Sequence, residues 1–153
     1  MSADLYEELL ERKEHVIALH TLDVDAALVQ FRVVSRRSGK SIYHWDENHG
    51  FVSMKAGDIT VPGSRKLADA LHYVLQSMHY GIYVMTGFER QLRHGCVQSL
   101  KEIAHAQDGH ERKVILLAAD IMLPGLLADS VYHVVEDQTL VVRPRLRDGR
   151  WIV

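Results

Sequence analysis

The chain of 153 residues has little cysteine, little proline and no excess of positive charge. Its single cysteine, Cys96, excludes an internal disulfide, and the N-terminal residues do not read as a secretory leader, so we expect a cytoplasmic protein. Lysine and arginine number 18 against 20 for aspartate and glutamate, which gives no general support for binding nucleic acid. No apolar run approaches the roughly 18 residues of a membrane span, so we expect no membrane association.

What the chain does have is a regular alternation of two hydrophobic periodicities. With 47% hydrophobic residues, it is long enough to form one core, so we expect a single domain over residues 1–153. Helices are expected over 4–13, 24–37, 65–78, 96–107 and 124–128, and strands over 15–20, 41–45, 80–86, 113–119 and 131–135. Strands that alternate with helices in this way predict an α/β fold, three-layered, with a mostly parallel five-stranded sheet.

Two regions depart from this alternation. Residues 46–63 are polar and contain glycine, so we expect a loop there, with a short extended piece at 58–61. At the other end, residues 139–146 and 150–153 flank Asp148-Gly149, which predicts a C-terminal β-hairpin extension over 139–153. Pro144 places its strand at a sheet edge.

The fragment Ser38-Gly39-Lys40-Ser41 matches the end of a phosphate-binding loop, but its surroundings do not. Such a loop follows a strand and opens a helix, with another glycine five residues before the second. Here Val34 holds that first glycine position, and the order is helix, turn, strand. We therefore interpret Gly39 as the residue that ends a helix with positive φ.

Histidine and cysteine offer two further candidates. The segment from His44 to His49 is dense in potential metal ligands, yet it lacks the helical spacing of a zinc site, so we predict no metal site and no bound cofactor. Cys96 stands close to His94, which suits a reactive thiol, but no further partner accompanies them. We favour a buried structural role for Cys96.

The ends of the expected strands carry the residues best placed to bind a small molecule. In an open parallel sheet, ligands bind beyond the carboxyl ends of the strands. The candidate ligand-binding residues are Thr21, Asp23, Asp46, His49, Gly87, Phe88 and Asp120. Their carboxylates either hold a metal or hydroxylated ligand or cap the helices that begin nearby, and we favour capping.

The hairpin carries the only basic cluster. Arg143, Arg145 and Arg147 alternate with other residues near Trp151, and we expect them to form an interaction surface. The cluster could contact a protein, bind RNA or protect the sheet edge from aggregation. The negative overall charge favours a protein contact or edge protection.

Two segments resemble a known family. Residues 80–88, with a strand that begins at Gly81 and is followed by Phe88, and residues 113–120, followed by Leu123-Pro124, resemble the N-terminal, degenerate ATPase-like domain of AAA ATPases of the cyanobacterial and plastid type. The likeness also covers the expected elements from 15 to 45. It implies a RecA/AAA-like sheet with the strand order 5-1-4-3-2.

The resemblance also indicates what this chain lacks. In an active ATPase of this type the phosphate-binding loop follows the first strand, where this chain has the acidic turn from Thr21 to Asp25. The Walker B carboxylates would end the third strand, where Met85-Thr86-Gly87 stand. Without an intact Walker A or Walker B motif, an ATPase is not expected.

We therefore expect a non-catalytic RecA/AAA-like domain that acts as a protein-interaction or regulatory module, with a protein partner or a second copy of itself. One alternative is a small metal- or nucleotide-binding enzyme that uses the carboxylates at the strand ends. Another is RNA binding through the arginine-rich hairpin.

Overall fold

The computed structural model describes residues 3–55, 59–106 and 111–136. In chain order the elements are α1 (Ala3–Glu11), β1 (Val16–His20), α2 (Val24–Ser38), β2 (Ile42–Asp46), β3 (Gly50–Ser53), α3 (Leu67–Gln76), β4 (Gly81–Met85), the 3-10 turn η1 (Glu89–Gln91), α4 (His94–Ala104), β5 (Arg112–Ala118), α5 (Gly125–Ala128) and β6 (Tyr132–Val135). The predicted hairpin over 139–153, with Arg143, Arg145, Arg147 and Trp151, lies outside the described residues.

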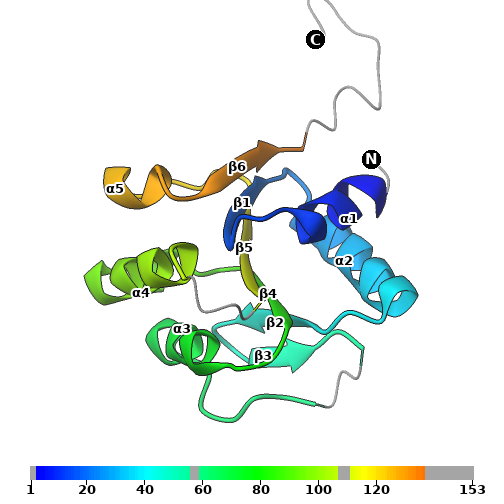
Figure 1. Ribbon diagram of the computed structural model, residues 1–153, viewed down its shortest axis with the longest axis horizontal. Coiled ribbons are helices and arrows are strands. Elements are labelled where there is room, and N and C mark those ends of the chain that lie inside the picture. The colour runs from blue at the N-terminus through cyan, green and yellow to red at the C-terminus, as the bar shows by residue number, and fades with distance from the viewer. Residues whose placement is uncertain (1–2, 56–58, 107–110, 137–153) are drawn as a thin grey trace, which may run out of the picture.

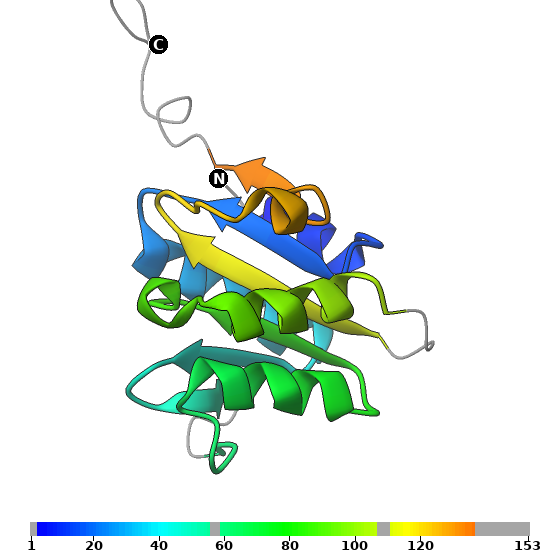
Figure 2. The ribbon, with the colours of Figure 1, turned by 90° about the vertical axis from the view of Figure 1, so that its left-hand side faces the viewer.

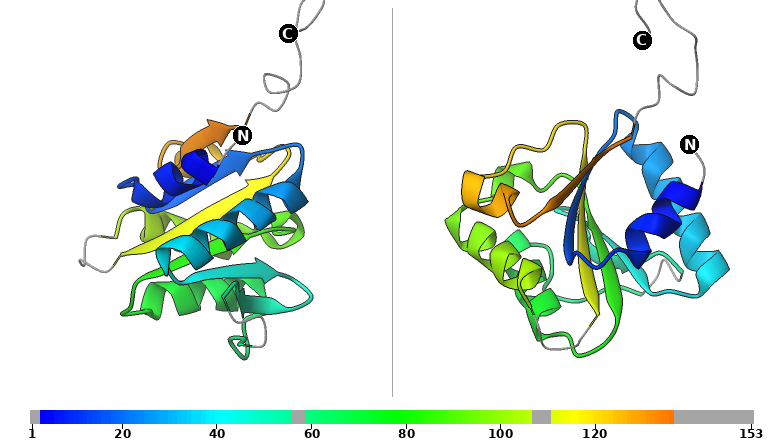
Figure 3. Two further views of the ribbon diagram at one scale, coloured as in Figure 1. Left: turned by 90° about the vertical axis from the view of Figure 1, so that its right-hand side faces the viewer. Right: turned by 45° about the horizontal axis from the view of Figure 1, so that its top comes forward.

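The sheet separates two layers of helices, as predicted. Helices α1 and α2 cover one face, and α3, α4 and α5 cover the other (Figures 1 and 3). Alternation along β1 produces this arrangement, because successive side chains of a strand point to opposite faces. Val16 and Ala18 belong to the core beneath α3 and α4, whereas Ile17 and Leu19 belong to the core beneath α1 and α2.

The sheet has six strands in the order β3-β2-β4-β5-β1-β6, so the predicted five-stranded order is incomplete. The five strands β2, β4, β5, β1 and β6 are parallel to one another, and the edge strand β3 is antiparallel to β2. The added strand β3 lies within the predicted loop over 46–63. Beyond it, Thr60 makes a single antiparallel bridge with Val52, in the region where we predicted a short extended piece.

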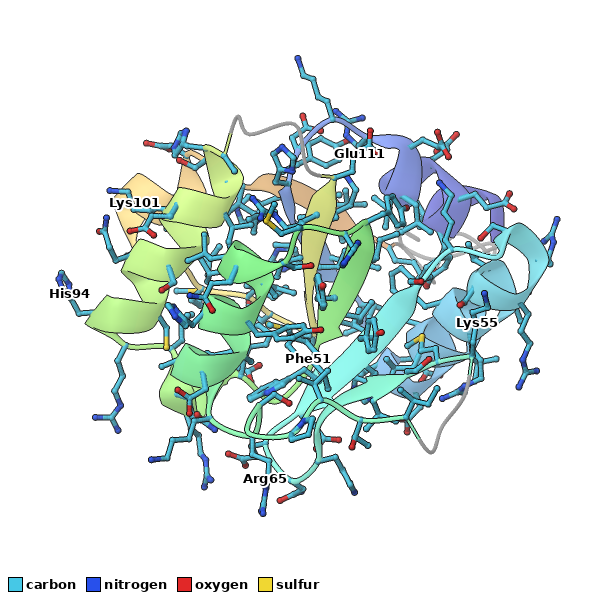
Figure 4. The ribbon with its side chains drawn as sticks, turned by 60° about the horizontal axis from the view of Figure 1, so that its bottom comes forward. Phe51, Lys55, Arg65, His94, Lys101 and Glu111 are labelled. Carbon is cyan, nitrogen blue, oxygen red and sulfur yellow. The ribbon has the colours of Figure 1, made fainter. Side chains whose placement is uncertain are left out.

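A tight turn and a buried aromatic ring stabilise the β2–β3 hairpin. Asp46 Oδ1 accepts hydrogen bonds from the backbone N–H groups of Asn48 and His49, each at 2.9 Å, which closes the turn. Gly50 then adopts φ +71, a conformation that favours glycine. Phe51 of β3 lies between the sheet and α3 (Figure 4) and packs against the rings of Tyr73 and Tyr83. The Phe51 ring thus anchors to the core a four-residue strand that also pairs with β2.

The fragment around Gly39 ends a helix, as predicted. Gly39 has φ +75, and its N–H donates to the carbonyl of Ser35 at 3.0 Å. Lys40 follows, and its ammonium donates to Glu11 at 2.8 Å. This geometry is a helix C-cap that leads into β2.

In the described part of the chain, no helix combines the length and the apolar character that a membrane crossing requires.

Candidate functional site

The carboxyl ends of β1, β2, β4, β5 and β6 form one edge of the sheet. In Figure 2 their arrowheads point to the same side, and the connections that follow β1 and β5 lie next to each other there. Thr21 and Asp23 follow β1, Asp46 ends β2, Phe88 follows β4 and Asp120 follows β5. The fold thus brings the predicted residues to one edge, although it does not bring them to one site.

The turn after β1 is closed by its own hydrogen bonds. The backbone N–H of Thr21 donates to the carbonyl of Ala118 on β5 at 2.9 Å, and the Thr21 side chain is buried. Asp23 Oδ1 accepts from the N–H of Ala26 at 3.0 Å, so Asp23 is the N-cap of α2. The preference for capping over ligand binding thus agrees with the geometry of Asp23, and Thr21 points into the protein.

Thr21 is part of a buried polar network that the sequence did not reveal. Glu136, which follows β6 and is 8% exposed, accepts a hydrogen bond from Thr21 Oγ1 and another from Tyr6 Oη of α1, both at 2.9 Å. Burial, the hydrogen bond to Glu136 and nearby negative charge raise the pKa of Tyr6 above its usual range. In the sequence, the one indication that Tyr6 is buried is its position on the same helical face as Leu9 and Leu10.

Asp46 and His49 form a separate pair at the far side of this edge. His49 Nδ1 lies 2.9 Å from Asp46 Oδ1. Burial would by itself raise the pKa of Asp46, but hydrogen bonds from the side chain and backbone of His49 and from the backbone of Asn48 lower it below its usual value. Strands β4 and β5 separate this pair from the turn after β1, so Asp46 and His49 do not share a site with Thr21 and Asp23.

Phe88 and Asp120 do come together. They line a pocket of about 540 Å³ between the connection after β4 and the connection after β5. Gly87, with φ +64, turns the chain at the end of β4 into this wall. The remaining lining residues are Glu89, Leu92, Met122, Leu123 and Pro124. The pocket is thus walled mainly by apolar side chains and carries two carboxylates.

Three large apolar side chains are exposed at the same edge. Met122 is 80% exposed, Leu22 75% and Val135 72%, and these are the three most exposed large apolar side chains of the described residues. They follow or end the neighbouring strands β5, β1 and β6. Exposed apolar side chains gathered in one region are typical of a binding surface.

A histidine pair lies beside this surface and was also not predicted. His20 Nε2 of β1 is 3.2 Å from His133 Nδ1 of β6, and His20 Nδ1 accepts a hydrogen bond from the N–H of Ile121 at 3.3 Å. Burial and the neighbouring His133 lower the pKa of His20. The bond from Ile121 requires a lone pair on Nδ1, so this geometry favours neutral His20 with its proton on Nε2.

The metal-ligand and thiol candidates from the sequence do not form a site among the described residues. Within residues 3–55, 59–106 and 111–136, no group of three or more His, Cys, Asp or Glu side chains is arranged to hold a metal ion. Cys96 is buried in the core beneath α4, as we favoured from the sequence. His94 points outward at the start of α4 (Figure 4).

At the opposite edge of the sheet lies a smaller pocket, of about 230 Å³, with several basic side chains. Two of these cations are already engaged. Lys113 donates to the carbonyls of Arg12 and Glu14, and burial lowers its pKa. Lys40 is paired with Glu11.

Comparison with known proteins places most of the chain in one family. Residues 3–136 match the model of the N-terminal domain of SpoVK-like AAA ATPases. No curated protein matches the chain.

Proposed function

This chain belongs to the family of N-terminal domains of SpoVK-like AAA ATPases, and we propose that it is a non-catalytic binding module of RecA/AAA-like fold. In this proposal the sheet positions a surface for protein contacts, and the module regulates or recruits through that surface. A nucleotide has no role at its strand ends.

The observation that carries the proposal is how the backbone amides in the turn after β1 are used. The N–H of Thr21 donates to Ala118, and the N–H of Asp23 donates to Thr21 Oγ1 at 3.3 Å. The N–H groups of Ala26 and Ala27 donate to the side chain and the carbonyl of Asp23. A phosphate-binding turn needs such N–H groups to point at the ligand, together with a helix N-terminus free of negative charge. Here these four amides donate within the protein, and the Asp23 carboxylate occupies the helix start.

The end of β4 supports the same conclusion. Thr86 Oγ1 lies 2.8 Å from Nε2 of the partly buried His44. The polar group that follows β4 is thus engaged with the neighbouring strand β2. No carboxylate stands at this position to hold a magnesium-bound water, because Met85, Thr86 and Gly87 occupy it.

The remaining candidate surface is the carboxyl edge, where Leu22, Met122 and Val135 are exposed and Met122 also lines the pocket. We propose this edge as the contact surface for a protein partner or for a second copy of the chain. The basic segment with Arg143, Arg145, Arg147 and Trp151 remains a candidate second surface.

Thermal unfolding with and without nucleotide tests the proposal. A nucleotide present at a hundredfold excess over its Kd would stabilise the folded state by about 2.7 kcal/mol. For a domain of this size, that stabilisation corresponds to a rise in Tm of roughly 5–10 °C. We expect no shift with 1 mM ATP or ADP and magnesium, and a reproducible rise of that size would refute the proposal.

Self-association requires its own measurement. Light scattering after size exclusion, over roughly a hundredfold range of concentration, should show the average mass rise if two copies associate through this edge. Met122→Glu should weaken the association, because it puts a charge on the apolar surface. Met78→Glu is the matched control, because Met78 is 67% exposed but lies before β4, at the opposite edge. A constant monomer mass would refute self-association.

A further inference from the structure

We propose that the pocket lined by Phe88 and Asp120 at the carboxyl edge, the carboxyl-edge pocket, is the docking site for residues 139–153 of the same chain. The docked residues would cover this edge until a partner displaces them. This inference rests on the proposed role of that edge as a contact surface. It assigns the occupant of the pocket and a form of self-regulation.

The described residues end at the carboxyl edge of the sheet, directly after β6. Glu136 is held at the carboxyl edge by its two side-chain hydrogen bonds, from Tyr6 and Thr21, and by its N–H, which donates to the carbonyl of His20 at 2.8 Å. The residues that follow therefore leave from a fixed point on this edge, beside the exposed side chain of Val135.

The pocket lies within reach of the residues that follow Glu136. The pocket lies between the connections after β5 and β4, and only β1 stands between β6 and β5. Neighbouring strands are about 4.8 Å apart, so Glu136 and the pocket are separated by roughly 10–15 Å along the edge. About four or five extended residues cover this distance. The segment from Leu140 onward can therefore reach the pocket without any change in the fold.

The segment and the pocket are complementary in charge and in apolar character. Residues 139–153 contain four arginines and one aspartate, and the arginines stand among Leu, Val, Trp and Ile side chains. The pocket offers the matching chemistry, because apolar walls from Phe88, Leu92 and Leu123 lie beside the carboxylates of Glu89 and Asp120. Asp120 and Glu89 are exposed, and the one cation of the adjoining 3-10 turn, Arg90, is paired with Glu47. An apolar side chain next to an arginine fits this site.

Tethering strengthens such a contact. A segment joined to the domain by a short linker has an effective concentration in the millimolar range, so a weak contact is enough to keep the pocket occupied. A partner would then have to compete with the segment. Occupancy of the edge is thus set by the chain itself.

Site-specific photocrosslinking tests the proposal on the full chain. Replacing Met122 with benzoylphenylalanine places the crosslinker on the pocket wall, and mass spectrometry identifies the attached peptide. We expect crosslinks to residues 139–153 in the band of monomer mass. The same crosslinker at Met78, which is also largely exposed but lies at the opposite edge, should give at least roughly tenfold less crosslinking to these residues, because it cannot contact a segment docked at the carboxyl edge.

Charge reversal in the pocket tests the electrostatic part of the proposal in the same crosslinking assay. Glu89→Lys with Asp120→Lys should lower the crosslinking from position 122 by roughly three- to tenfold, because it replaces attraction to the arginines by repulsion. Asp69→Lys, on the exposed surface of α3, should leave it unchanged.

The outcomes separate clearly. Crosslinks from position 122 only to residues 3–136, or a yield equal to that from position 78, would overturn the proposal. Crosslinks to 139–153 that appear only at dimer mass would also overturn it, and would assign the pocket to a second copy. None of these results affects the nucleotide test, so failure of the docked segment is distinguishable from failure of the proposed function.

Discussion

Replacing Tyr6 by Phe would remove one hydroxyl from the buried network that joins α1 to the end of β6. Tyr6 is 1% exposed, and its ring packs edge-on against Phe31 with the ring centroids 4.9 Å apart. Phenylalanine keeps this packing. What the substitution removes is the 2.9 Å hydrogen bond to the Glu136 carboxylate, which would then keep Thr21 as its remaining side-chain donor in this network.

The expected cost follows from the charge of the acceptor. A hydrogen bond to a charged group contributes about 1.5–3 kcal/mol, and a buried carboxylate that loses a donor also loses part of the compensation for its desolvation. We expect Tyr6→Phe to lower the free energy of unfolding by about 2 kcal/mol. Tyr83→Phe is the matched control, because Tyr83 is 2% exposed but its hydroxyl makes only a 3.5 Å contact with the neutral Ser77. There we expect about 0.5 kcal/mol.

Urea unfolding followed by circular dichroism at pH 7 measures both values. Alkaline pH adds a signed test. Because burial and Glu136 raise the pKa of Tyr6 above its usual 10.0, the unfolded chain releases this proton first, so the stabilising contribution is lost as pH rises above about 10. Tyr6→Phe should therefore flatten the loss of stability above that pH. Equal costs for the two Phe substitutions, or an unchanged alkaline slope, would refute the assignment of this hydrogen bond.

Three further predictions concern the same architecture. Gly50→Ala should cost more than Gly63→Ala in urea unfolding, since both glycines have positive φ but only at Gly50 would a Cβ meet Ser64 Oγ at 2.5 Å; we expect roughly 1 kcal/mol at Gly63 and at least 2 at Gly50. Burial lowers the pKa of His44 below its usual 6.5, so the unfolded chain takes up this proton at a higher pH than the folded chain does. Stability should therefore fall as the pH drops below 6.5. A urea midpoint that depends equally on pH in His44→Gln would contradict this. Asp23→Ala should cost about 1 kcal/mol in the same assay through loss of the α2 cap, and a neutral result would argue against the capping role.

The sequence predicted the parts of the fold that depend on local periodicity. The helix that ends at Gly39 and the apolar strand β5 both follow directly from side-chain spacing and a stop signal. Strand β3 was missed because its four residues follow a polar turn and carry only one fully buried large side chain, Phe51. A strand of this kind is specified in part by the rings of Tyr73 and Tyr83 that pack on Phe51, which are contacts distant in the sequence.

The candidate site shows the same division. Phe88 and Asp120 could be placed together from the sequence, because the carboxyl ends of adjacent parallel strands meet at one edge. That Thr21 would point inward could not be predicted, since its partner Glu136 lies 115 residues away. A carboxylate at the end of a strand is usually solvated, and no local pattern indicates the tyrosine that makes its burial possible.

Glu136 also connects the two proposals. Its carboxylate withdraws the Thr21 hydroxyl from the turn after β1, where a phosphate-binding loop would need flexible, unpaired donors. The same side chain fixes the point at which the following residues leave the sheet. If Glu136→Gln weakens both contacts, the turn after β1 and the start of the segment should loosen together, because one buried group holds both. One buried carboxylate thus closes the turn after β1 and fixes the end of β6, so a single substitution at Glu136 bears on both proposals.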